Sequence, residues 1–178
     1  TWSDWTNFEG NANALRLLTH QFKGRRFGGS AMTYSTISAL VKYPCESINR
    51  NKSNVYQKKY GFFQPEKEVY NTIADELGII KFSEKPISYY RHPLVFLVEA
   101  ADDICYNIID LEDAHRLGIL SFEKVKELYY GFFNDSEIEK HEKMLSELND
   151  KNEELSYLRA NVIGKLIYQC AGTFIKNH

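Results

Sequence analysis

The stretch that decides the fold is Arg91-His-Pro-Leu-Val-Phe-Leu-Val-Glu-Ala-Ala-Asp-Asp-Ile-Cys-Tyr-Asn-Ile-Ile-Asp-Leu-Glu-Asp-Ala-His115, which predicts one long, largely apolar helix. Polar residues spaced three or four apart form a stripe along one face of it: Glu99, Asp102, Tyr106, Asp110 and Asp113. A helix that is apolar nearly all round is usually buried, and buried carboxylates are usually paired or metal-bound. The stripe is therefore predicted to need a partner, either a cation, a ligand or basic side chains.

Apolar residues recur at helical spacing along most of the remaining chain. The predicted helices cover residues 11–22, 32–41, 66–77, 93–117, 122–133, 136–148 and 156–176. Ser30, Ser121 and Asp135 precede helical segments and are predicted to cap them, because their side-chain oxygens can accept hydrogen bonds from the first free backbone N–H groups.

Polar residues dominate 46–64, and 82–90 is also predicted as a loop. The sequence contains no convincing strand pair and no internal repeat. The predicted fold class is all-α, an irregular helical bundle. It is expected to form one helical segment over residues 1–178, with a loop excursion at about 43–64.

Composition limits the classes of protein without deciding among them. The 178 residues suit one domain, and the 14% of aromatic residues favours folding over disorder. A formal net charge of −2 gives no general attraction to nucleic acid, so such a partner is possible but unsupported. No apolar run is long enough for a membrane span, and Cys105 and Cys170 in apolar contexts indicate core thiols in a reducing compartment. A cytoplasmic location and no membrane partner are expected.

Within the acidic stripe, Asp102 lies deepest in the apolar run and is the strongest candidate for a metal ligand. Hard divalent cations prefer oxygen ligands such as carboxylates. The alternative is a structural network in which these acids pair with Arg or Lys from neighbouring helices, and spacing alone leaves both open. Asp103 lies about 100° around the helix from Asp102 and is expected to pair or cap instead.

Glu112 and His115 match the Glu-x-x-His pattern of di-iron bundles. Such bundles use two copies of the pattern, and this sequence contains only one. His115 is also placed near the polar end of the predicted helix, so a solvated histidine is the favoured interpretation. The other histidines are too scattered along the chain to form a metal triad that the sequence can reveal.

Basic residues that could meet phosphate groups occur at Lys23, Arg25, Arg26, Lys42, Lys58 and Lys59. Lys42 and Lys59 each precede a tyrosine, and glycines near residue 28 could allow close backbone approach, although they match no phosphate-loop template. Taken singly, each of these basic residues is an ordinary surface residue.

Five segments of the chain carry recognisable motifs: Asn7-Phe-Glu-Gly-Asn-Ala-Asn-Ala-Leu-Arg-Leu-Leu-Thr19, Met32-Thr-Tyr-Ser-Thr-Ile-Ser-Ala-Leu-Val-Lys-Tyr-Pro44, Lys58-Lys-Tyr-Gly-Phe-Phe63, residues 91–114 and Leu158-Arg-Ala-Asn161. In this order they resemble segments of bacterial dGTP triphosphohydrolases. The first is similar to that family's Phe-Glu-Gly-Asn-Ala-Gln-x-x-Arg segment and the second to the helix that follows it. The third is similar to Lys-Lys-x-Gly-Tyr-Tyr/Phe, the fourth to the Glu-Ala-Ala-Asp-Asp-Ile helix, and the fifth to a further segment of the family. The family belongs to the HD-domain phosphohydrolases.

The resemblance implies hydrolysis of a deoxynucleoside triphosphate to nucleoside and inorganic triphosphate. It implies that Asp102 is the last ligand of a His…His-Asp…Asp metal site that holds Mg²⁺ or Mn²⁺. It also implies that Tyr106 and Asp110 face the sugar, that Asn11 and Lys42 lie at the nucleotide site, and that Lys59 meets the phosphates.

The departure from the family pattern is large, because the His and His-Asp ligands and the catalytic acid/base residues would lie upstream of Thr1. The family's C-terminal part is missing as well. The chain is therefore expected to be the central part of a longer enzyme, inactive alone, and the resemblance implies a homo-oligomer. The alternative hypothesis is a non-catalytic nucleotide-binding or oligomerisation module.

Overall fold

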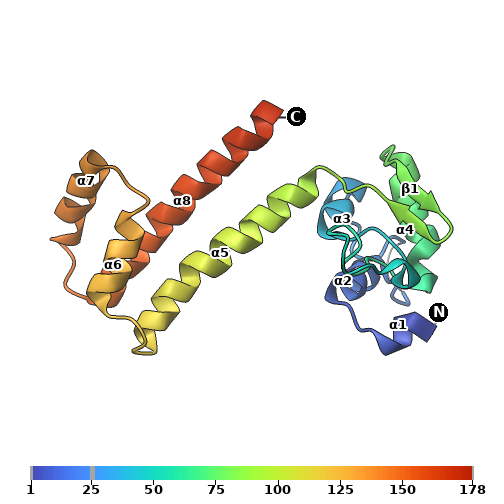
Figure 1. Cartoon of the computed structure of the whole chain (residues 1–178), viewed down its shortest axis with the longest axis horizontal. Helices are drawn as coiled ribbons and strands as arrows, with labels where there is room; N and C mark the ends of the chain where they lie inside the picture. The colour runs from blue at the N-terminus through green and yellow to red at the C-terminus, as the bar shows by residue number, and fades with distance from the viewer. Residues whose placement is uncertain (1, 25–26, 178) are drawn as a thin grey trace. The chain divides into compact units, whose positions relative to one another are not determined.

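The computed structural model describes residues 2–24 and 27–177. Over these residues it contains eight α-helices, two short 3-10 helices and one two-stranded sheet, which confirms the predicted mostly helical fold (Figure 1). The internal contacts divide the chain into two compact units, Thr1–Val98 and Glu99–His178.

The first unit combines short helices with a hairpin. Its elements are α1 (Trp2–Thr6), α2 (Gly10–Thr19), α3 (Tyr34–Leu40), η1 (Ser47–Asn49), η2 (Gln64–Glu66), α4 (Lys67–Glu76), β1 (Lys81–Glu84), β2 (Ile87–Tyr89) and the first turn of α5 (Leu94–Arg116). Thr33, not Ser30, caps α3, because its hydroxyl accepts a hydrogen bond from the backbone N–H of Thr36 at 3.2 Å. Arg25 and Arg26 lie outside the described residues.

The prediction of a loop over residues 82–90, without any strand pair, is wrong. β1 and β2 form an antiparallel hairpin, and isolated bridges join Cys45 to Ser88 and Glu46 to Phe62. The strands are only four and three residues long, and β2 is buried at every position, so neither shows the apolar–polar alternation that marks a strand in sequence. The first bridge joins the start of the 43–64 segment to the hairpin, and the second joins the two ends of the segment to each other.

Aromatic side chains form the centre of the first unit's core. Phe62 stacks on Tyr70 with ring centroids 5.1 Å apart, and Tyr70 meets Tyr89 edge-on at 5.5 Å. Leu15 and Ile73 complete the packing from α2 and α4, and all five side chains are buried. Buried aromatic pairs of this geometry contribute about 0.5–1.5 kcal/mol beyond their area.

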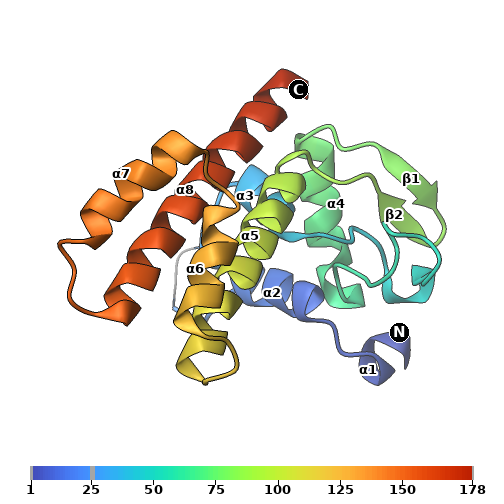
Figure 2. The ribbon, with the colours of Figure 1, turned by 60° about the vertical axis from the view of Figure 1, so that its left-hand side comes forward.

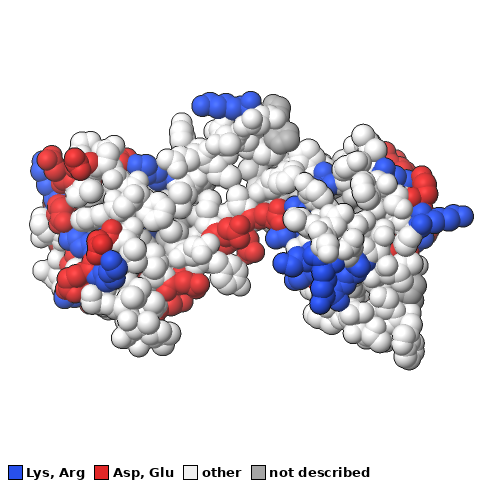
Figure 3. Space-filling model, viewed as in Figure 1, with Lys and Arg blue, Asp and Glu red and all other residues white. Residues whose placement is uncertain are grey.

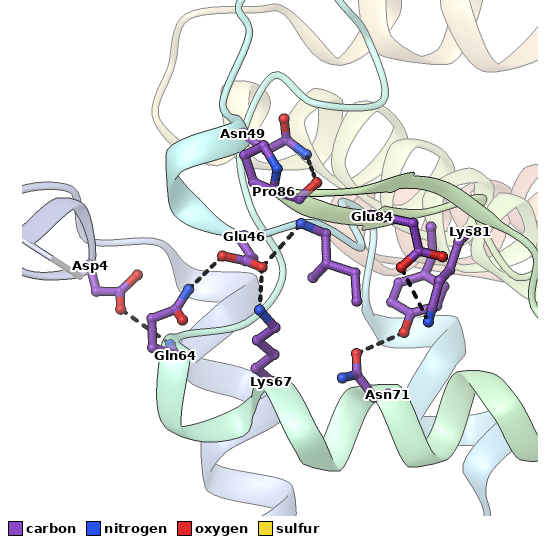
Figure 4. A network of polar contacts seen from close by, with 11 residues as sticks. Asp4, Glu46, Asn49, Gln64, Lys67, Asn71, Lys81, Glu84 and Pro86 are labelled. Atoms are coloured by element: carbon purple, nitrogen blue, oxygen red, sulfur yellow. Dashed lines mark hydrogen bonds and ion pairs between the residues drawn. The ribbon is translucent and has the colours of Figure 1, made fainter.

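A buried carboxylate ties the polar loops of this unit together (Figure 4). Glu46 lies 2.8 Å from the Lys67 ammonium, accepts a hydrogen bond from the Gln64 amide at 2.8 Å, and accepts another from the backbone N–H of Ile87 at 3.0 Å. Burial alone would raise the pKa of Glu46, but these three donors outweigh it and lower the pKa from 4.5. Asp4 joins the same network by accepting from the backbone N–H of Gln64.

The second unit is built from the rest of α5 with α6 (Phe122–Tyr130), α7 (Asp135–Leu145) and α8 (Lys151–Asn177). The Ser121 cap is confirmed, whereas Asn134, not Asp135, caps α7 through a capping box with Glu137. α6 runs beside α8 in both views (Figures 1 and 2). The buried core consists of Ile108, Val125, Tyr129, Leu145, Leu155, Leu158 and Val162.

The three cysteines differ in their exposure to solvent. Cys45 is buried and Cys170 partly buried, but Cys105 is exposed, so the expectation that Cys105 is a core thiol is wrong. Among the described residues, the core of the second unit includes α5 only through Ile108 and Leu111, and Cys105 lies before them. Across residues 2–24 and 27–177, no helix has the length and apolarity that crossing a membrane requires.

His141 makes the attachment of α7 to α8 sensitive to pH. Its ring lies 4.4 Å from the Phe133 ring and its Nδ1 lies 3.1 Å from the Tyr157 hydroxyl. Burial lowers the pKa of His141 from 6.5, with smaller effects from Glu137, which raises it, and from Lys140 and Lys165, which lower it. The folded state binds the proton of His141 more weakly than the unfolded state does. The contribution of neutral His141 to stability is therefore fully present above pH 6.5 and is lost as the pH falls below this value.

We therefore expect amide-exchange protection in α7 to weaken between about pH 7 and about pH 5. A His141→Gln variant should lose most of this pH dependence, whereas His20→Gln, at an exposed histidine of the first unit, should retain it. If protection of α7 depended on pH as strongly in the His141→Gln variant as in the parent chain, His141 would not be the source of the pH dependence.

Candidate functional site

Glu9 brings two of the predicted site residues together in the first unit. It is the N-cap of α2, and its Oε1 accepts a hydrogen bond from the Asn11 side-chain amide at 2.8 Å and from the Asn11 backbone N–H at 3.3 Å. The ammonium of Lys59 lies 3.8 Å from the same oxygen. The Glu9 side chain is 8% exposed and that of Lys59 is 50% exposed. The buried carboxylate therefore positions a lysine that remains half accessible to solvent.

The Lys58–Phe63 segment reaches this position by close backbone packing. Gly61 donates its N–H to the Cys45 carbonyl at 3.1 Å, and the Cys45 thiol donates to the Lys59 carbonyl at 3.4 Å. A Cβ on Gly61 would lie 2.4 Å from the Tyr43 carbonyl oxygen, so only glycine allows this approach. Tyr60 is buried and its hydroxyl donates to the carbonyl of Asn7, which joins the segment to the connection between α1 and α2.

Lys42 lies on the backbone segment that Gly61 contacts. It follows Val41, the C-cap of α3, is partly exposed, and places its ammonium 5.9 Å from the centre of the Tyr43 ring. Lys42 and Lys59 therefore belong to adjoining segments of the same unit. Basic side chains also gather over the part of this unit that contains α2 (Figure 3). Such a surface attracts anions.

Asp102, Tyr106 and Asp110 share one face of α5 in the second unit, as their spacing predicts. The prediction that this stripe is buried is wrong for this chain, because Asp102 and Asp110 are exposed and Tyr106 is 67% exposed. Red side chains accordingly line α5 in the space-filling view (Figure 3). The second unit's core covers a different face of α5, through Ile108 and Leu111.

The residues present fit a metal site only in part. Mg²⁺ is commonly held by one or two carboxylates together with water and substrate phosphates, and the exposed Asp102 carboxylate can supply one such ligand. No cluster of three or more His, Cys, Asp or Glu that could hold an ion occurs within residues 2–24 and 27–177.

Glu112 makes ion pairs and a hydrogen bond within the second unit, so its contacts are structural and do not support the di-iron interpretation. Its side chain is 1% exposed, pairs with Arg116, lies 2.9 Å from the Arg159 guanidinium and accepts a hydrogen bond from Ser156 at 3.2 Å. His115 is partly buried and its Nδ1 lies 3.2 Å from the Leu120 carbonyl, so it is less solvated than the sequence suggested. Arg159 belongs to the Leu-Arg-Ala-Asn segment, and this ion pair is its structural role.

In the first unit, Asn11 and Lys59 thus both contact the Glu9 carboxylate. In the second unit, Asp102, Tyr106 and Asp110 lie on one face of α5. Sequence reasoning missed Glu9 as the residue that organises the first group. A glutamate just before a helix that begins with glycine is the signal that could have identified it, because an acid there caps the helix and neutralises its N-terminal dipole.

Comparison with known proteins identifies relatives along nearly the whole chain, although no family model matches it. A deoxyguanosinetriphosphate triphosphohydrolase-like protein of Synechocystis sp. is 37% identical over 97% of the chain and 39% of its own length. One of Pseudomonas aeruginosa is 34% identical over 97% of the chain and 38% of its own length. A deoxyguanosinetriphosphate triphosphohydrolase of Yersinia enterocolitica is 30% identical over 98% and 35% respectively. The chain spans less than two-fifths of the length of these relatives, and over that part its sequence is similar to theirs.

Proposed function

We propose that this chain forms the nucleotide-contacting part of a metal-dependent triphosphohydrolase that converts a deoxynucleoside triphosphate, of which dGTP is the model, to nucleoside and triphosphate. The observation that carries the proposal is the Glu9 cluster, in which a buried carboxylate positions Asn11 and the half-exposed Lys59. Both residues lie in segments that resemble the family, and the names of the relatives refer to the same substrate.

Within this proposal, positively charged lysines of the chain meet the negatively charged phosphates of the substrate. Lys59 binds the phosphates, and Lys42, on the adjoining segment, offsets their remaining charge, because a lysine ammonium meets phosphate as a point charge. Asn11 fixes the nucleotide through its amide. On α5, Tyr106 and Asp110 contact the sugar, where a carboxylate can accept hydrogen bonds from hydroxyl groups.

Asp102 is the one residue of this chain that we assign to the metal, which is Mg²⁺ or Mn²⁺. When bound, the ion would offset phosphate charge and lower the pKa of a bound water. The His and His-Asp ligands and the catalytic acid/base residues belong, in this proposal, to an HD-type centre completed from outside residues 1–178. A homo-oligomer in the cytoplasm is part of the same proposal.

Calorimetric titration of the 178-residue chain with dGTP in the presence of Mg²⁺ tests the binding role. Lys59→Ala should weaken the affinity about tenfold, because one charge-assisted contact to phosphate is lost. Lys52→Ala, at an exposed lysine in the loop between η1 and η2, is the matched control and should leave the affinity unchanged. Equal affinities for the parent chain and the Lys59→Ala variant would contradict the assignment of Lys59.

The same titration with and without Mg²⁺ tests Asp102. In the Asp102→Asn variant the gain in dGTP affinity that Mg²⁺ provides should disappear, while metal-free binding persists. Full Mg²⁺-dependent binding by Asp102→Ala, together with loss of binding in Lys42→Ala, would instead favour a non-catalytic nucleotide-binding module. Triphosphate release by the parent chain alone would show that no outside ligands are needed, which would overturn the proposed incomplete centre.

A further inference from the structure

The first unit contains a cavity that the proposed function does not use. Its volume is about 340 Å³, and it lies between the loop around Tyr56, the hairpin and the start of α5. Neither Glu9 nor any predicted site residue of this unit lines it.

Aromatic side chains make the walls of this pocket. Tyr56, Phe82, Tyr90 and Phe96 line it, and each is exposed by 45% to 57% of its surface. The Phe82 and Tyr90 rings meet edge-on, with centroids 5.6 Å apart. Exposed aromatic residues that gather around a hollow differ from scattered surface residues, because together they offer flat faces to a planar ligand.

Ser88, which also lines the pocket, carries an unsatisfied polar group. The residue is 1% exposed, and its hydroxyl oxygen has no hydrogen-bond partner among the residues that the structure describes. A buried hydroxyl without a partner is unfavourable, since it has lost its water without gaining another bond. A ligand atom within reach of Ser88 would remove that cost.

Positive charge completes the pocket. Arg91 lines it, and its guanidinium lies 5.0 Å from the centre of the Tyr56 ring and 6.0 Å from that of Phe96. The described lining includes neither Asp nor Glu. Arg favours planar carboxylates, whose two oxygens match its donors, so the pocket suits a ligand with an anionic end.

The volume limits the size of the ligand. Ligand cavities span about 300–1,000 Å³, and this pocket lies near the lower limit, which suits one ring system rather than a nucleoside triphosphate. We propose that the pocket binds a small planar aromatic carboxylate, whose ring lies between the aromatic walls while its carboxylate meets Arg91 and Ser88.

The test uses indole-3-acetate as the probe, with the 178-residue chain followed by NMR of its backbone amides. Shifts are expected at residues 54–57, 82–91 and 96, where the pocket lies. Indole, which lacks the carboxylate, should bind at least about tenfold more weakly, because charge-assisted hydrogen bonds are lost. Acetate, which lacks the ring, should give no saturable shifts.

Two variants separate the pocket from non-specific binding. Ser88→Ala should weaken indole-3-acetate about fivefold through one lost hydrogen bond, and Tyr90→Ala about tenfold through lost stacking. Phe27→Ala, which removes an exposed aromatic residue elsewhere in the unit, should have no effect. Equal affinity for indole and indole-3-acetate would overturn the anionic assignment. Shifts outside these segments, or no difference between Tyr90→Ala and Phe27→Ala, would overturn the site.

Discussion

Replacing Glu112 by alanine is expected to lower the free energy of unfolding of the second unit by about 4 kcal/mol. The Glu112 side chain is 1% exposed and lies 2.9 Å from the guanidinium of Arg159, with Arg116 and Ser156 as further partners. Removing the carboxylate leaves the partly buried Arg159 without its counter-charge and opens a gap between α5 and α8. Both effects act in the same direction.

Native-state hydrogen exchange at amides of α6 and α8 measures this loss within the second unit. Glu127→Ala is the matched control, because Glu127 pairs with Lys124 on the surface of α6, and an exposed pair contributes about 0–1 kcal/mol. In a double-mutant cycle, Glu112→Ala and Arg159→Ala should be strongly non-additive, since they remove the same pair. Additive losses, or a Glu112→Ala loss no larger than that of the control, would contradict the structural role of this ion pair.

The longer helices of this protein were predictable because their apolar periodicity and end signals are local, whereas the five-residue α1 was not predicted. Ser121 begins α6 as expected, and Gly118 adopts a positive φ of 71° just after α5, which suits its place as the predicted end signal. Boundaries were wrong where two cap residues compete, as at Asn134 and Asp135, because either side chain could accept the same hydrogen bonds.

The hairpin and the organisation of the site depend on contacts between distant segments, which local patterns do not contain. β2 is stabilised by pairing with Cys45, some forty residues earlier, and Glu9 meets Lys59 across fifty residues. The burial of α5 was overestimated for a related reason. An apolar helix predicts that other residues pack against it, but its sequence does not show which face the core of this chain covers. Tyr106 lies on a face of α5 that remains exposed.

Replacing Gly61 by alanine is expected to cost the first unit about 3 kcal/mol, because the added methyl group has no space. Its carbon would lie 2.4 Å from the Tyr43 carbonyl oxygen and 2.5 Å from Val41 Cγ1, so the backbone must move. Gly164→Ala is the opposite control: nothing lies within 4 Å of its added carbon, and alanine in a helix interior gains about 0.5–1 kcal/mol over glycine.

Hydrogen exchange at amides of α2 and α4 reports the stability of the first unit, and dGTP calorimetry reports the position of Lys59. Since Gly61 lies two residues after Lys59 and sets its approach to the Val41–Tyr43 segment, Gly61→Ala should weaken dGTP binding as well as stability. The Gly164→Ala control should change neither dGTP affinity nor exchange in the first unit. If Gly61→Ala destabilised the unit while dGTP affinity stayed the same, the close packing would serve folding alone, and the proposed role of Lys59 would be wrong.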